Sequence, residues 1–155
     1  MDITDLITPD SVLPSLKAGT KKQVLHELAR KAAALTGQNE RTIGEVLTER
    51  ERLGSTGVGL GIGIPHGKLP GLERIIGVFA RLEKPVDFDA IDDQPVDLVF
   101  LLLAPAGAGA EHLRALALVS RLLRDRSTCA KLRGTDNQLA LYSLLVEDSA
   151  SSNAA

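Results

Sequence analysis

Apolar residues recur at helical spacing in two stretches near the N-terminus. In the first stretch the apolar positions are Val24, Leu25, Leu28, Ala32 and Leu35. Thr20, a residue type that accepts hydrogen bonds from the first turn of a helix, precedes this stripe, and Gly37, a type that ends helices, follows it. The pattern therefore predicts a helix between Thr20 and Gly37.

The second stretch follows Asn39, another favoured N-cap residue. The residues on its apolar stripe are Ile43, Val46 and Leu47. Arg50 falls on the same stripe, and Gly54 marks the end of the pattern. This helical phase places Arg50 in the last turn, where it points toward the start of a glycine-rich segment.

Four further stretches have the patterns of extended strands, and they are residues 12–16, 54–68, 75–82 and 96–104. The first contains Pro14, so we expect a short edge strand, where a missing backbone N–H is tolerated. In 54–68 glycines alternate with apolar residues, which predicts a strand with one bare face that Pro65 ends. The continuous apolar run of 96–104 is typical of a buried central strand.

Helical patterns return in the last third of the chain, at 111–125, 128–133 and 137–147, and loops are expected at 85–95 and 105–110. Ser127 and Asp136 are the predicted N-caps of the last two helices. The small, polar residues 149–155 predict a disordered tail, which leaves 1–148 as one folded domain. Helices on both sides of the strands in sequence favour an α/β layered fold.

Composition excludes several classes of function. The 155 residues are 44% hydrophobic and 25% charged, as in ordinary globular domains. Lys and Arg number 18 against 20 Asp and Glu, and aromatic residues are 3%, so neither a basic surface nor stacking platforms favour nucleic-acid binding. Cys129 is the only cysteine, which we interpret as a buried apolar residue. No apolar run is long enough to insert into a membrane and the N-terminus lacks a signal pattern, so we expect a cytoplasmic protein.

The glycine-rich segment does not match the common nucleotide motifs. A P-loop needs a glycine five residues before the Gly67–Lys68 pair and a hydroxyl residue after it, but Ile62 and Leu69 stand there. No register of the glycines fits a dinucleotide fingerprint. The spacing around Ser55 is wrong for a nucleophile elbow.

The three histidines are His26, His66 and His112. Their spacing gives no metal-binding pair, so we expect no metal, and His26 is interpreted as a surface residue. His66, between Pro65 and Gly67, remains as a nucleophile, because a neutral imidazole can attack phosphorus without a separate base. Read from residue types alone, it could equally be a turn histidine without chemistry.

Positive charge and hydrogen-bond donors would have to stabilise a phosphoryl group on His66. Arg50 is the natural candidate, since Arg52 lies about 200° around the helix from it. Backbone N–H groups of the glycine segment are expected to contribute donors. His112, in the first turn of its helix, could hold the phosphoryl group or could be a solvated polar residue.

Four segments resemble IIA proteins of the fructose/mannitol class of the bacterial phosphoenolpyruvate-dependent phosphotransferase system. They are RERLGSTGVG at 50–59, GIGIPHGK at 61–68, FDAIDDQPVD at 88–97 and EHL at 111–113. The resemblance covers residues 5–147 and is strongest with the nitrogen-regulatory IIA branch. It implies a mixed β-sheet flanked by α-helices on both faces, and no metal or organic cofactor.

The resemblance also implies the chemistry. His66 would accept a phosphoryl group on Nε2 from a phosphorylated HPr-type carrier, with Arg50, His112, Ser55 and Thr56 as supporting residues. Partners such as sensor kinases or potassium transporters would respond to the phosphorylation state. The alternative is a sugar-specific IIA component that passes phosphate to a IIB domain for fructose or hexitol uptake.

Two residues depart from the family pattern: Leu60 replaces a common Asn, and Gly63 replaces a common Ala. The loss of Asn removes a donor that could lie near the phosphoryl group. For docking of the phosphate donor we expect an apolar surface around His66, with Leu60, Leu69 and Leu72 as candidates.

Overall fold

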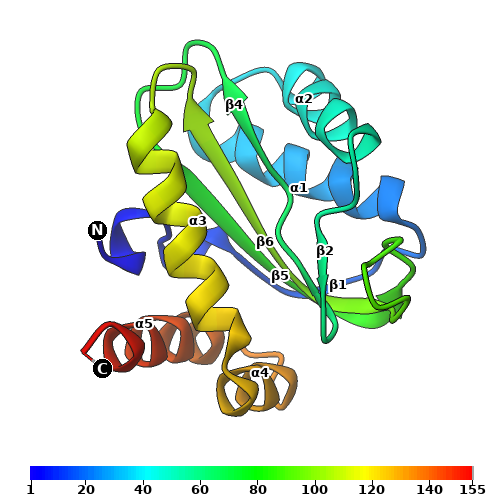
Figure 1. Ribbon diagram of the computed structural model, residues 1–155, viewed down its shortest axis with the longest axis vertical. Helices are drawn as coiled ribbons and strands as arrows, with labels where there is room; N and C mark the ends of the chain where they lie inside the picture. The colour runs from blue at the N-terminus through cyan, green and yellow to red at the C-terminus, as the bar shows by residue number, and fades with distance from the viewer. Residues whose placement is uncertain (155) are drawn as a thin grey trace.

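A mixed six-stranded sheet carries the fold in the computed structural model, which describes residues 1–154 and the side chains of residues 1–151 (Figure 1). Its strands are β1 (Val12–Leu16), β2 (Gly57–Gly59), β3 (Ile62–Gly63), β4 (His66–Leu69), β5 (Ile76–Val86) and β6 (Val96–Pro105). The helices are α1 (Lys21–Thr36), α2 (Glu40–Arg52), α3 (Gly109–Arg124), α4 (Arg126–Arg133) and α5 (Gln138–Ala154). Two short 3₁₀ turns, Ile3–Asp5 and Pro9–Ser11, precede β1.

The strands follow the order β1-β5-β6-β3-β2, and β4 pairs with the same edge of β6 as β3 does. β1 runs parallel to β5, whereas β5 runs antiparallel to β6. β3 and β4 both run parallel to β6, and β2 folds back antiparallel to β3. The sheet is therefore mixed, with the apolar strand β6 at its centre, as the sequence predicts.

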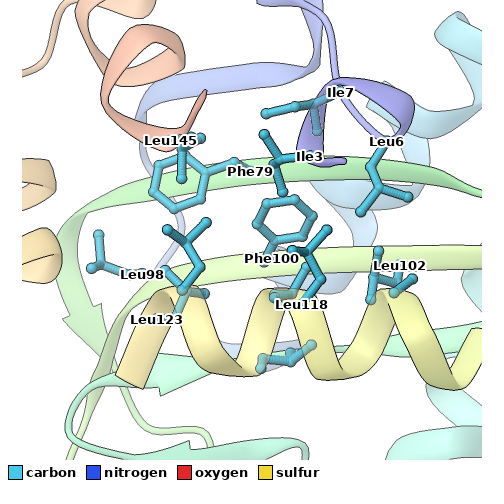
Figure 2. Packing of buried hydrophobic residues seen from close by; sticks show 14 of the residues in the cluster. Ile3, Leu6, Ile7, Phe79, Leu98, Phe100, Leu102, Leu118, Leu123 and Leu145 are labelled. Atoms are coloured by element: carbon cyan, nitrogen blue, oxygen red, sulfur yellow. The ribbon is translucent and has the colours of Figure 1, made fainter. Parts of the chain in front are cut away.

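Both faces of the sheet are covered, and β6 supplies side chains to both cores. Its residues Leu98, Phe100 and Leu102 belong to one core, and Val99, Leu101 and Leu103 to the other. α1 and α2 cover the second core, while α3, α4 and α5 cover the first (Figure 1). Figure 2 shows the first core, in which Phe79 and Phe100 pack with ring centroids 6.2 Å apart beneath α3.

Local sequence signals place the first two helices as predicted. The Thr20 side chain accepts a hydrogen bond from the backbone N–H of Gln23, and Gly37 ends α1 with a φ of 73°. Asn39 accepts from the N–H of Thr42 and begins α2. β1 is also an edge strand, as Pro14 predicts.

The glycine-rich segment is not one strand, and this prediction is wrong. β2 and β3 form a hairpin whose two-residue turn is Leu60–Gly61, with φ values of 57° and 81°. Both residues of a type I′ turn need positive φ, and Asn-Gly is its usual sequence. The turn is not recognisable from the sequence, because Leu60 continues the alternation of apolar residues. Leucine also rarely adopts a backbone conformation with positive φ.

The C-terminal predictions need three boundary corrections. Asp125 caps α4 through the N–H groups of Ser127 and Thr128, so Ser127 is not the cap. The side chain of Asn137 accepts from the N–H of Ala140, so the cap of α5 is not Asp136. α5 continues to Ala154 and buries Ser149, so the predicted start of a disordered tail at 149 is wrong, while residue 155 lies outside the described residues.

β5 also extends further than predicted, through Pro85 to Val86, and the loop that follows begins later than residue 85. The pairing of β5 with β6 shifts register between Arg81 and Val86. A proline is tolerated there because an irregular ladder does not need its N–H.

The turn at Leu60 provides a test of this backbone geometry. We expect Leu60→Asn to stabilise the protein by about 0.5–1 kcal/mol, because Asn adopts the left-handed conformation at lower cost than leucine. Denaturant unfolding followed by circular dichroism measures the change. An unchanged or lower midpoint would contradict the type I′ assignment.

Candidate functional site

A break in the sheet orients His66. β3 pairs with β6 at Leu98 and Val99, and β4 resumes the pairing at His66 opposite Leu102. Ile64 and Pro65 lie between the two paired segments. The carbonyl of Ile64 lies 2.9 Å from Nδ1 of His66. Since a carbonyl only accepts, Nδ1 carries the proton in this contact.

The other ring nitrogen of His66 then holds the lone pair. A proton on Nδ1 of a neutral imidazole leaves Nε2 as the acceptor and nucleophile. Nε of Arg50 donates toward this Nε2 at 3.4 Å. The ring is half-buried, so Nε2 is held by the fold and still reachable. His66 thus lies at the start of a strand rather than within a loop.

Arg50 reaches the imidazole from the last turn of α2, as the helical phase predicts. Its Nη1 donates to the carbonyl of Gly54 at 2.7 Å, which fixes the guanidinium at the helix end. The close approach of α2 to β4 depends on Gly67, because a Cβ there would lie 2.6 Å from Cγ1 of Val46. Gly67 therefore serves the packing that brings Arg50 to His66.

His112 reaches the same place from the first turn of α3. Its ring meets that of His66 edge to face, with centroids 5.6 Å apart and planes at 69°. The His112 side chain is only 8% exposed, and its Nε2 has no hydrogen-bond partner among the described residues. Burial, and then the nearby charges of His66 and Lys68, lower the pKa of His112. A neutral His112 can therefore offer an N–H without adding a second positive charge.

Ser55 and Thr56 have other partners. The hydroxyl of Ser55 donates to the carbonyl of Phe88 at 2.5 Å, and the hydroxyl of Thr56 donates to the carboxylate of Glu51. Glu51 is also paired with Lys21 at 2.5 Å. These bonds tie the segment after α2 to its surroundings and use the hydroxyl protons. A phosphate contact from Ser55 or Thr56 stays a prediction.

Sequence reasoning did not find the Lys21–Glu51 pair. The only available signal was two opposite charges near the ends of adjacent predicted helices, which the sequence does not bring together. The expected docking surface also needs correction: Leu69 and Leu72 are buried, whereas Leu60 is exposed. The glycines mainly allow close packing, since a Cβ at Gly57 would lie 2.8 Å from Cβ of Ala90.

The arrangement suits a tetrahedral anion attached to Nε2 of His66. The guanidinium of Arg50 donates toward this nitrogen from α2, and the ring of His112, whose buried Nε2 has no partner among the described residues, lies beside the His66 ring from α3 on the other face of the sheet. Desolvated donors of this kind stabilise phosphoryl oxygens strongly.

The chain is similar to known proteins along nearly its whole length. Residues 5–148 match the family described as phosphoenolpyruvate-dependent sugar phosphotransferase system, EIIA 2. A nitrogen regulatory protein of Bradyrhizobium diazoefficiens is 62% identical over 145 residues, which cover 94% of this chain and 95% of that protein. A fructose-specific EIIA component of Haloferax volcanii is 36% identical over 95% of this chain and 98% of its own length.

A solved structure shares the fold. The crystal structure of the nitrogen regulatory protein IIA-Ntr from Neisseria meningitidis aligns with a TM-score of 0.87 and 31% identity, over 92% of this chain and 98% of that one. Among the described residues, no helix combines the length and apolar character that a membrane crossing requires.

The lowered pKa of His112 predicts a pH dependence of stability. Between the ordinary histidine pKa of about 6.5 and the lower folded value, unfolded His112 binds a proton that the folded side chain does not. The contribution of His112 to the free energy of unfolding is therefore fully present above this pH window and is lost as the pH falls through it. Histidine NMR titration should give a pKa for His112 below 6.5.

The matched variant is His112→Gln, which keeps an amide donor but does not titrate. Its free energy of unfolding should fall less than that of the wild type between pH 7.5 and pH 5. Equal losses in both proteins would show that His112 does not titrate with a lowered pKa.

Proposed function

This chain belongs to the EIIA 2 family of the phosphoenolpyruvate-dependent phosphotransferase system, and we propose that it is a nitrogen-regulatory phosphocarrier that acts through His66. In this proposal a phosphorylated HPr-type carrier donates its phosphoryl group to Nε2 of His66. The observation that carries the proposal is the hydrogen bond between Nδ1 and the Ile64 carbonyl, which leaves Nε2 as the nucleophile beside Arg50.

The transfer balances without a separate base. The P–N bond of the donor's phosphohistidine breaks as a P–N bond forms at Nε2 of His66. A donor ring that holds a proton on its other nitrogen leaves as neutral imidazole. His66 becomes the phosphoimidazolium, whose Nδ1–H already donates to the Ile64 carbonyl. Arg50 and the N–H of His112 would meet the phosphoryl oxygens.

Phosphorylation would change the local charge more than the fold. A phosphoryl group brings nearly two negative charges to the side of the Arg50 guanidinium. The pKa of His112 should then rise, because the phosphoryl group adds negative charge beside it. We propose that cytoplasmic partners such as sensor kinases or potassium transporters distinguish the two charge states.

A second candidate role, supported by the similarity to a fructose-specific EIIA component, is transfer of the phosphoryl group to a IIB protein for fructose or hexitol uptake. The chemistry at His66 is the same in both roles. Loss of label from the phosphorylated protein on addition of purified IIB would support the transport role, and retention would support regulation.

Replacement of His66 tests the proposed acceptor. Incubation with phosphoenolpyruvate and the carrier enzymes should place acid-labile phosphate on the wild type and none on His66→Ala. Radiolabelled phosphoenolpyruvate and gel autoradiography measure the transfer, and circular dichroism checks the fold. Equal labelling of both proteins would overturn the proposal.

Replacement of Arg50 tests the electrostatic support. Arg50→Ala should slow phosphoryl transfer about a hundredfold, because one preorganised donor to developing charge is lost. Arg52→Ala is the matched control: Arg52 lies on the same turn of α2 but is exposed and paired with Glu49. Rapid-quench kinetics should show a rate within twofold of the wild type for Arg52→Ala, and an equal effect of both variants would remove the special role of Arg50.

A further inference from the structure

The hairpin turn displays an apolar side chain in an unusual way. Leu60 has a positive φ and is 55% exposed, so it gains little burial in return for a strained backbone. Its N–H donates to Oδ2 of Asp92 at 2.9 Å, and its carbonyl accepts from Nη2 of Arg133 at 2.9 Å. The backbone of Leu60 is therefore held from both sides while the side chain faces outward.

The two clamping residues are themselves fixed. Arg133 forms a two-pronged ion pair with Asp97, through Nε at 2.8 Å and Nη2 at 2.9 Å. Asp92 accepts from the N–H groups of Leu60 and Gln94, and these bonds lower its pKa. Because Asp92 and Arg133 are fixed in this way, they hold the backbone of Leu60 in a defined position.

Other apolar residues surround this tip. Val58 is 56% exposed and Ile91 is 85% exposed, and a Cβ at Gly59 would lie 3.8 Å from Cγ2 of Ile91. Beside the hairpin runs a groove of about 370 Å³ between β2, β3 and α3. Its lining includes Val58, Leu60, Ile62, Ile64, Leu123 and Arg124.

This groove leads from the hairpin tip toward His66. Ile64 lines the groove, and its carbonyl accepts the hydrogen bond of His66. On the opposite wall, α3 runs from His112 beside His66 to Arg124, a length of about 18 Å. A standard protein interface covers about 800 Å² per partner, which is about 28 Å across. A patch of this width that has His66 toward one edge also reaches the hairpin tip, because about 18 Å is less than about 28 Å.

The far end of the groove carries unpaired positive charge. Arg124 is exposed and has no ion-pair partner among the described residues. A partner that fits this end presents an apolar side chain to Val58 and Leu60 and a carboxylate to Arg124.

We propose that this groove, with Leu60 as its apolar anchor and Arg124 as its charged end, is the docking surface for the phosphodonor protein. The inference rests on the proposed function, since it is the donor's phosphohistidine that has to reach His66. Leu60 then determines how well the donor binds, although it takes no part in the chemistry at Nε2.

The test compares two phosphate donors on the same variants. Phosphoramidate is a small donor whose P–N bond breaks as the bond to Nε2 forms, with ammonia as the leaving group, so it needs no protein docking. The second donor is the purified phosphorylated HPr-type carrier. Leu60→Asn should raise the KM for the carrier about tenfold and leave kcat and the phosphoramidate rate within twofold of the wild type.

Leu60→Asn keeps the turn and is expected to be more stable, so misfolding would not explain a loss of docking. Leu139→Asn is the control, because Leu139 is 65% exposed on α5 and lies outside the groove. It should leave the KM for the carrier unchanged. Arg124→Glu should raise that KM severalfold at low salt and less at high salt.

The outcomes separate the two proposals. An unchanged KM of Leu60→Asn for the carrier, with normal labelling of the wild type, would overturn the docking surface alone. An equal rise in Leu139→Asn would also overturn it. Failure of the carrier to label wild-type His66 would overturn the proposed function and the docking surface with it.

Discussion

The hydrogen bond between Nδ1 of His66 and the Ile64 carbonyl is the interaction on which the site depends. An imidazole has two nitrogens, and this single contact decides which one carries the proton and which one the lone pair. The carbonyl is placed by the sheet, since the paired residues on either side of the Ile64–Pro65 break are both bound to the buried strand β6. Backbone geometry thus decides which ring nitrogen of His66 holds the lone pair.

The same strand explains why two helices from opposite faces can meet at one nitrogen. β4 lies beyond β6 with α2 on one side and α3 on the other, so Arg50 and His112 approach His66 from separate layers. Their charges differ: Arg50 is a permanent cation, whereas burial and the neighbouring charges lower the pKa of His112. In the proposed transfer, an arriving phosphoryl group would raise the pKa of His112 and so add a positive charge beside that of Arg50.

Sequence reasoning succeeded where local signals decide the structure. Thr20, Gly37 and Asn39 mark helix ends through their own side chains or φ values, and helix phase alone placed Arg50. It failed where tertiary contacts override the local pattern. The Leu60–Gly61 turn reads as a strand because its conformation is enforced by distant residues, and the expected anchor Leu69 is buried by packing that no local pattern reveals. The hydroxyl partners of Ser55 and Thr56 likewise come from long-range folding.

Leu60 has a positive φ, which leucine rarely adopts, and yet its turn is well defined. Asn suits a left-handed turn better than leucine does. Asp92 and Arg133 both bind the backbone of Leu60, so the turn forms with leucine present despite its conformational cost. Because the backbone is fixed independently, the side chain is free to vary with the partner that it contacts. In the proposed docking, the exposed leucine at this strained position is covered by the partner, and this contact explains why an apolar side chain stands there.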